Sequence, residues 1–280
     1  MGQQKRGHVA GQALKPPFAY YGGKTTLAPQ IAKLLPDHDH YVEPFAGSLA
    51  VLLAKEQTGW ETVNDLDGHL VNFWRVLRDR PGELIRAASL TPHSRDEYTH
   101  ATQQLEAEQD DLERARQVWT ILTQGRSNRL SGWGWRVRQN PDMGTSMPDY
   151  VAAYAGRMDG VAERLKNVTI ENRDAVEVIQ EYGRHKGVCI YADPPYLGST
   201  RGGSYRIEMK EDNLHVKLAS ALKDCKASVV LSGYASPLYE ELYEGWHRYE
   251  LKAPTRLSGT AAPNEILWSN VPLGDQTSLF

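Results

Sequence analysis

Residues 187–196 combine an apolar run with groups that could act on an amine, in the sequence GVCIYADPPY. An exocyclic amine on an aromatic base is a poor nucleophile because its lone pair is delocalised into the ring. Two acceptors held at its two hydrogens would free that lone pair, and the Asp193 carboxylate and the Pro194 carbonyl can supply them. Because Pro194 and Pro195 lack N–H donors and have a restricted φ, both acceptors would be held in place. Tyr196 could stack on the base, which must first be flipped out of any duplex.

A glycine turn and two acids follow other predicted strands. Gly47 follows an apolar segment and allows a ligand to approach the backbone, but the three-glycine dinucleotide pattern is absent, which favours a nucleoside over a pyrophosphate. Asp65, 22 residues after Glu43, lies where such folds hold a ribose hydroxyl, and Asp174 is placed to accept from an adenine amino group. The alternatives are a plain turn at Gly47 and helix N-caps at Asp65 or Asp67 and at Asp174.

Two glycines and a lysine precede the first helical pattern. Gly22 and Gly23 permit a tight turn, and Lys24 follows them directly. The spacing of a P-loop is missing, so this is no phosphate cradle of that kind. Lys24 is therefore either a solvated loop residue or part of a site.

The elements that would position these residues alternate along the chain. Seven short apolar segments bounded by turn residues are predicted as strands: 40–45, 60–66, 168–174, 187–195, 227–234, 247–254 and 265–271. Helical patterns at 25–36, 48–56, 175–184 and 211–225 lie between several of them. The alternation predicts an α/β fold with a mostly parallel sheet that is covered on both faces.

The alternation stops between residues 73 and 165, where charged helical patterns follow one another. Four apolar residues within 94–124 are predicted to share one helical face: Leu105, Leu112, Trp119 and Leu122. The acidic run 106–113 would be a solvated face of that helix. We therefore predict a split catalytic domain, 1–72 with 166–280, and an inserted domain at 73–165.

The motifs, taken in order, resemble the Dam-like (alpha-class) family of DNA adenine N6-methyltransferases. The matching stretches are YYGGK, EPFAG, NDLD, DPPY, LSGYASPLYEEL (231–242) and NEILWSN (264–270), and the resemblance covers roughly 18–75 and 165–271. It implies a Rossmann-like, seven-stranded core that uses S-adenosylmethionine (SAM), with an inserted, mainly helical target-recognition domain. It also implies sequence-specific methylation of N6 on a flipped adenine in duplex DNA.

The resemblance further implies a role for each motif residue. The methionine end of SAM and the active site would be approached by Tyr20, Gly22 and Lys24, and the SAM site would be lined by Glu43, Phe45 and Gly47. Asp65 would bind the ribose of SAM and Asp174 its adenine. The flipped adenine would be held by Asp193, Pro194, Pro195 and Tyr196, and Asp193 would also lie beside the cofactor. The chain departs from some relatives after Gly47, where Ser48 and Leu49 replace a second glycine.

Arginine and aromatic residues inside the predicted insertion indicate how DNA could be read. The candidates are Arg126, Asn128, Arg129, Trp133, Trp135, Arg136 and Arg138. Arginine can pair with guanine edges and asparagine with adenine, while aromatic rings can fill the gap that a flipped base leaves. The alternative is a surface loop with a tryptophan packed beneath it. The segment 197–206 is predicted as a loop over the substrate, with Arg201 and Arg206 for phosphates.

The C-terminal residues Gln276–Phe280 resemble the short peptides that bind the bacterial sliding clamp. Leu279 and Phe280 could enter an apolar groove on such a partner. A disordered end, or a tail packed on the sheet, is the alternative.

Composition limits the remaining choices. A net charge of −3 excludes a wholly basic nucleic-acid binder, two cysteines favour a reducing compartment, and no apolar run is long enough for a signal peptide or a membrane span. We expect a cytoplasmic protein of a bacterium or phage, with no metal site because its nine histidines are scattered. The alternative functions are methylation of cytosine N4 or of RNA adenine, methylation of glutamine in a protein, and DNA binding without catalysis.

Overall fold

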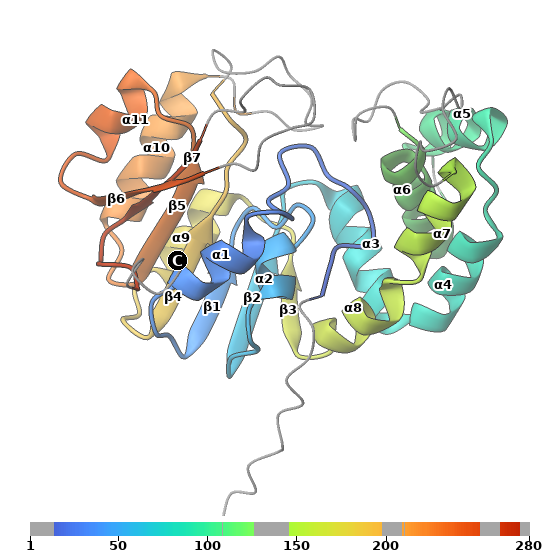
Figure 1. The fold of residues 1–280 in the computed structure, drawn as a ribbon, viewed down its shortest axis with the longest axis horizontal. Coiled ribbons are helices and arrows are strands. Elements are labelled where there is room, and N and C mark those ends of the chain that lie inside the picture. The colour runs from blue at the N-terminus through green and yellow to red at the C-terminus, as the bar shows by residue number, and fades with distance from the viewer. Residues whose placement is uncertain are drawn as a thin grey trace, which may run out of the picture.

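The computed structural model describes residues 14–107, 109–125, 146–197, 209, 211–252 and 264–274, and a seven-stranded sheet forms its centre (Figure 1). The strands are β1 His40–Glu43, β2 Trp60–Asn64, β3 Val168–Glu171, β4 Val188–Ala192, β5 Ser228–Gly233, β6 His247–Leu251 and β7 Glu265–Ser269. Their order is β3-β2-β1-β4-β5-β7-β6, and β7 pairs antiparallel with both of its neighbours while the other pairs are parallel. Each of the seven predicted strands is confirmed.

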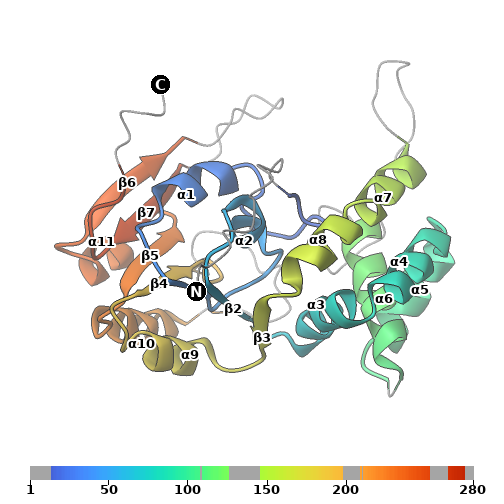
Figure 2. The same ribbon diagram turned by 90° about the horizontal axis from the view of Figure 1, so that it is seen from below.

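Helices cover both faces of this sheet, as the view from below shows (Figure 2). They are α1 Ala28–Leu34 and α2 Ala50–Ala54 on one face, and α9 Ala175–Tyr182, α10 Asp212–Lys223 and α11 Pro237–Leu242 on the other. Because successive strand residues point to opposite faces, Tyr41 and Tyr191 join one hydrophobic cluster while Val42 and Ile190 join the other. The predicted fold class is confirmed.

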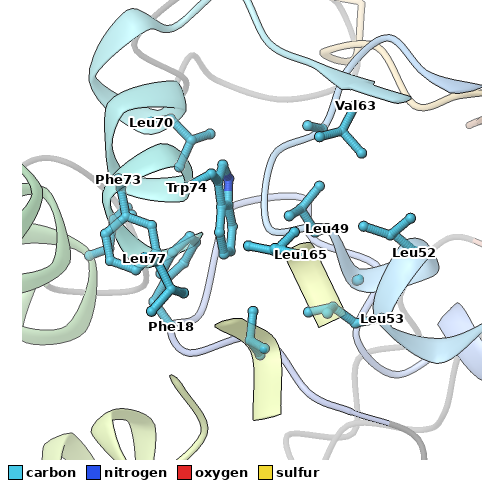
Figure 3. Packing of buried hydrophobic residues seen from close by; sticks show 14 of the residues in the cluster. Phe18, Leu49, Leu52, Leu53, Val63, Leu70, Phe73, Trp74, Leu77 and Leu165 are labelled. Carbon is cyan, nitrogen blue, oxygen red and sulfur yellow. The ribbon is translucent and has the colours of Figure 1, made fainter. Parts of the chain in front are cut away.

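Within the described residues, six further helices lie beyond the β3 edge of the sheet (Figure 1). They are α3 Gly68–Asp79, α4 Pro81–Leu90, α5 Arg95–Gln104, α6 Asp111–Gln124, α7 Met147–Ala155 and α8 Met158–Leu165. Phe73 and Trp74 of α3 share a buried cluster with Leu52 of α2 and Leu165 of α8 (Figure 3). The division of the chain at residues 72 and 165 stays a prediction, and α3 runs through the first of these positions.

The single helical face predicted for residues 94–124 is wrong. The chain forms two helices there, because Asp110 accepts a hydrogen bond from the Leu112 N–H at 3.0 Å and caps a new helix. The acidic run therefore lies in the turn between α5 and α6 and in the first turn of α6, where carboxylates interact favourably with the free N–H groups. Trp119 remains a buried residue of α6.

The segment before α1 passes through the helical region on its way to the sheet. Trp119 Nε1 donates to the Pro17 carbonyl at 2.9 Å, and Arg157 donates to the Pro16 carbonyl at 3.0 Å. Phe18 then packs edge-on against Phe73 (Figure 3). The described residues contain no helix with the length and apolar character that a membrane span requires.

Candidate functional site

A cavity of about 660 Å³ opens where the parallel strands β1, β2 and β4 end. Seven of the residues predicted for the site line it: Tyr20, Phe45, Gly47, Asp65, Asp174, Asp193 and Pro195. Leu214, Lys217 and Leu218 of α10 are among the residues on its other side. The sheet order reverses between β1 and β4, and open α/β sheets bind their ligands at such a point.

The turn after β1 is held in place by three neighbours. Gly47 has a φ of +48°, and a side chain there would come within 3.3 Å of the Tyr20 ring. Its N–H donates to Asp65 Oδ2 at 2.9 Å, and its carbonyl accepts from Trp74 Nε1 at 3.2 Å. Leu49, whose side chain is fully buried, also has a positive φ, +57°, a conformation that costs an L-residue roughly 1–2 kcal/mol.

The acidic residues that follow β2 and β3 cap helices, line the cavity or do both. Asp67 is the N-cap of α3, whereas Asp65 accepts from the N–H groups of Gly47 and Asp67 and keeps further lone pairs for a ligand. Burial raises the pKa of Asp65 to about 6. Asp174 serves as both, because it caps α9 through the Val176 N–H at 2.8 Å and also lines the cavity.

Asn64, which the sequence analysis did not single out, joins the loops around these acids. Its Nδ2 donates to the carbonyls of Pro44 and Arg173 at 3.0 and 3.1 Å, and its Oδ1 accepts from the Arg173 N–H at 2.8 Å. The side chain therefore fixes the ends of three strands relative to one another. Its position directly before Asp65 in the NDLD motif was the available signal.

Lys24 lies at the centre of a buried polar cluster. Its ammonium is 2.5 Å from Asp193 Oδ1, 2.9 Å from the Tyr196 hydroxyl and 3.5 Å from Glu265 Oε1. Burial opposes the charge, but the carboxylates of Asp193 and Glu265 outweigh it and raise the pKa of Lys24. Lys24 is therefore a paired, charged residue of this site, not a solvated loop lysine.

The two carboxylate oxygens of Asp193 differ in their hydrogen bonds to the described residues. Both hydrogen bonds to Asp193 that come from described side chains, Lys24 at 2.5 Å and Ser232 at 2.8 Å, go to Oδ1. Oδ2 can therefore accept a hydrogen from an amine. Pro194 is buried and Pro195 reaches the cavity.

Aromatic residues extend the cluster from the end of β5. The Tyr196 ring is 4.3 Å from the Tyr234 ring, centre to centre, with an angle of 7° between them. Ser232, Tyr234 and Glu265 all belong to motifs noted in the sequence, but nothing in the spacing indicated that β5 and β7 bring them to Asp193. The hydrogen bond from Ser232 to Asp193 spans 39 residues of sequence, and the one from Tyr196 to Glu265 spans 69.

Glu43 lines a smaller adjoining pocket together with Tyr20, Gly22 and Asp193. It is buried, and Tyr41 donates to its Oε2 at 3.1 Å. Burial raises the pKa of Glu43 to about 8, and the charge of Asp193 adds to this rise.

The buried Glu43 should make stability depend on pH. A carboxyl whose pKa is 4.5 unfolded and about 8 folded binds a proton more tightly in the folded state, so its contribution is present below pH 4.5 and is lost as pH rises toward 8. We expect the unfolding free energy of the wild type, relative to Glu43→Gln, to fall by about 3 kcal/mol between pH 5 and pH 8. Urea titrations of the ligand-free proteins would measure this. Glu56→Gln, at an exposed position, is the control, and parallel pH profiles for Glu43→Gln and wild type would contradict the expectation.

Several predicted contacts lie outside the described residues. They are Arg126, Asn128, Arg129, Trp133, Trp135, Arg136, Arg138, Arg201, Arg206 and the tail 276–280.

The sheet order and the antiparallel β7 match the fold of the SAM-dependent methyltransferases, with the cavity at the switch point of the sheet. The cavity suits a nucleoside because carboxylates, which would repel phosphates, lie along it. The model of the D12 class N6 adenine-specific DNA methyltransferases matches residues 20–257, and the chain belongs to this family. It is therefore a SAM-dependent enzyme that methylates N6 of adenine in DNA.

Two curated relatives match over most of their length. A type II methyltransferase, M1.LlaDCHI of Lactococcus lactis subsp. cremoris, is 28% identical over 88% of this chain and 90% of its own. A DNA adenine methylase of Serratia marcescens is 23% identical over 88% of this chain and 94% of its own. Among solved structures, a SAM-dependent methyltransferase from Agrobacterium tumefaciens aligns with 88% of this chain and 59% of its own at 11% identity and a TM-score of 0.37, too low to support an inference.

Proposed function

We propose that Asp193 and the Pro194 carbonyl hold the N6 amine of an adenine that has been flipped out of duplex DNA. The observation that carries this proposal is the position of Asp193, which lines the cavity and also contacts Lys24 in the buried cluster. Tyr196 stacks on the base. Lys24 and Ser232 orient the carboxylate through Oδ1, so that Oδ2 accepts one amine hydrogen.

The cavity residues hold SAM beside that amine, and SAM supplies the methyl group. Asp65 accepts from the ribose hydroxyls, Asp174 accepts from the adenine of the cofactor, and Phe45 and Gly47 line the space between them. Tyr20, Gly22, Lys24 and Glu43 surround the methionine end. Transfer is direct, with no covalent bond to the enzyme, because positioning and fixed acceptors are sufficient.

Incubation with labelled SAM and unmethylated duplex DNA, followed by digestion to nucleosides and mass analysis, tests this function. N6-methyladenine is the expected product, and sequencing of the modified DNA would give the recognition site. N4-methylcytosine would keep the mechanism and overturn the base assignment. Transfer to RNA alone, or SAM binding without any transfer, would overturn the proposed substrate.

The inserted region 73–165 is proposed to read the DNA sequence. Its arginines and tryptophans between 126 and 138, and Arg201 and Arg206, have the chemistry for base edges, gaps and phosphates. The similarity to a type II methyltransferase favours a setting beside a restriction endonuclease, in a bacterium or a phage.

The tail Gln276–Phe280 is proposed to bind the bacterial sliding clamp. Removal of these five residues should abolish capture of the chain by immobilised clamp and leave the methylation rate on short duplexes unchanged. A pull-down with the full chain and the truncated chain measures this. Equal capture of both would contradict the proposal.

A further inference from the structure

Glu265 is a buried carboxyl beside the proposed active site that has no part in the function described above. It begins β7 and is 3% exposed. Its Oε2 accepts from the Tyr196 hydroxyl at 3.2 Å. Its Oε1 has no hydrogen-bond partner within the part of the chain that the structure describes, although Lys24 Nζ is 3.5 Å away. A buried carboxylate oxygen without a hydrogen bond lowers the stability of the fold, and a catalytic role is one explanation for its presence.

Two short routes connect Glu265 with Asp193. The first runs through Lys24 Nζ, which is 2.5 Å from Asp193 Oδ1 and 3.5 Å from Glu265 Oε1. The second runs through the Tyr196 hydroxyl, which accepts from Lys24 at 2.9 Å and donates to Glu265 at 3.2 Å. Polar atoms therefore form a continuous path from the acceptor of the amine to a carboxyl that is shielded from solvent.

The charge of this cluster leaves a place for one proton. Two carboxylates and one ammonium sum to −1, and the amine must lose one proton for each methyl group that it gains. Burial raises the pKa of Glu265 to about 7, against the charge of Lys24 and with that of Asp193. Glu265 thus holds a proton more firmly than an exposed glutamate does.

We propose that Glu265 receives the proton that the adenine amine loses, an inference that rests on the function proposed for Asp193. The N–H bond of the amine breaks and its proton passes to the Asp193 carboxylate. The neutral carboxyl turns about its Cβ–Cγ bond, which brings the proton taken up on Oδ2 beside Lys24 Nζ. Lys24 then donates one proton to Glu265 and, in the same step, takes the proton held by Asp193. An O–H bond has formed on Glu265, and Lys24 and Asp193 have regained their first states. Glu265 gives the proton to water once the product has left.

The test compares Glu265→Gln, Glu265→Asp and a control, Glu250→Gln, whose half-exposed side chain lies on the neighbouring strand β6. Single-turnover methyl transfer to a duplex would be followed between pH 6 and pH 9 with saturating SAM. The wild-type rate should rise with pH with a midpoint near 7, because Glu265 must be ionised to accept a proton. E265Q should be slower by about 10²-fold and lose that midpoint, and E265D should recover part of both. E250Q should match the wild type.

Infrared titration of the SAM-free proteins gives a readout that is independent of activity. Three buried carboxyls should contribute protonated bands: Asp65 with a midpoint near pH 6, Glu265 near pH 7 and Glu43 near pH 8. The component near pH 7 should be present in the wild type and E250Q and absent from E265Q, while the other two remain in all three proteins. If E265Q does not fold, E265D must still show a slower rate and a displaced midpoint.

Three results would overturn the inference. The first is that E265Q has the rate and pH profile of the wild type. The second is that E265Q keeps the wild-type midpoint but binds SAM more weakly and is less stable, which would indicate a structural role. With either of these two results, inactivity of Asp193→Ala in the same experiment would still support the function proposed for Asp193. Full activity in Asp193→Ala is the third, and it would overturn the proposed function as well.

Discussion

Asp193→Ala should reduce the single-turnover rate of methyl transfer by at least about 10²-fold while SAM binding changes little. The substitution removes the acceptor for the amine hydrogen, which matters most as the nitrogen becomes tetrahedral. The cavity retains Asp65, Asp174 and the glycine turn, which are the contacts proposed for the cofactor. Rapid-quench kinetics with prebound DNA, together with calorimetric titration of SAM, would separate the two quantities.

Asp37→Ala is a matched control, because Asp37 is exposed in the loop between α1 and β1. It should leave both quantities at the wild-type level. Retained methyl transfer in Asp193→Ala would contradict the proposed role of Asp193, and a parallel loss of SAM binding would make it a cofactor residue instead.

Lys24→Met should lower the unfolding free energy by about 3 kcal/mol and also remove most of the methyl transfer. The ammonium is the only cation within 4.0 Å of the carboxyl groups of Asp193 and Glu265 among the described residues, so its loss leaves both without a cationic partner. Without it the pKa of Glu265 should rise further above 4.5. The stabilisation from the protonated carboxyl is then lost as pH increases, so the deficit should be larger at pH 8 than at pH 6.

Urea unfolding of Lys24→Met at the two pH values checks this expectation. Lys33→Met, at an exposed position of α1, should unfold like the wild type at both. A deficit of the same size at pH 6 and pH 8 would mean that lost packing, and not the unpaired carboxylates, dominates the effect.

The fold could be predicted because its signals are local. Each strand is a short apolar segment between turn residues, as in the fully buried β4, and such segments need no knowledge of distant contacts. The division between α5 and α6 was missed because the capping of a new helix by Asp110 competes with a periodicity that continues across the break. Two short helices and one long helix have nearly the same apolar pattern there.

The site could be predicted in part, because motifs mark residues at strand ends but not their partners across the sheet. Asp65 and Asp193 were expected at one edge because parallel strands end together. Glu265 could not be assigned in this way, since β7 runs antiparallel and its first residue reaches the same edge as the ends of the parallel strands. The contact of Lys24 with Glu265 depends on that reversal of direction.

The anchoring of residues 14–18 limits how target specificity could be exchanged between relatives. A chimera that replaced α6 and the residues around α7 would discard Trp119 and Arg157, which hold the carbonyls of Pro17 and Pro16. Lys24 follows Pro17 by seven residues, so the stretch that carries it would lose its attachment. If region 73–165 reads the target as proposed, the unit to be transplanted is discontinuous, because these helices must be moved together with residues 14–18.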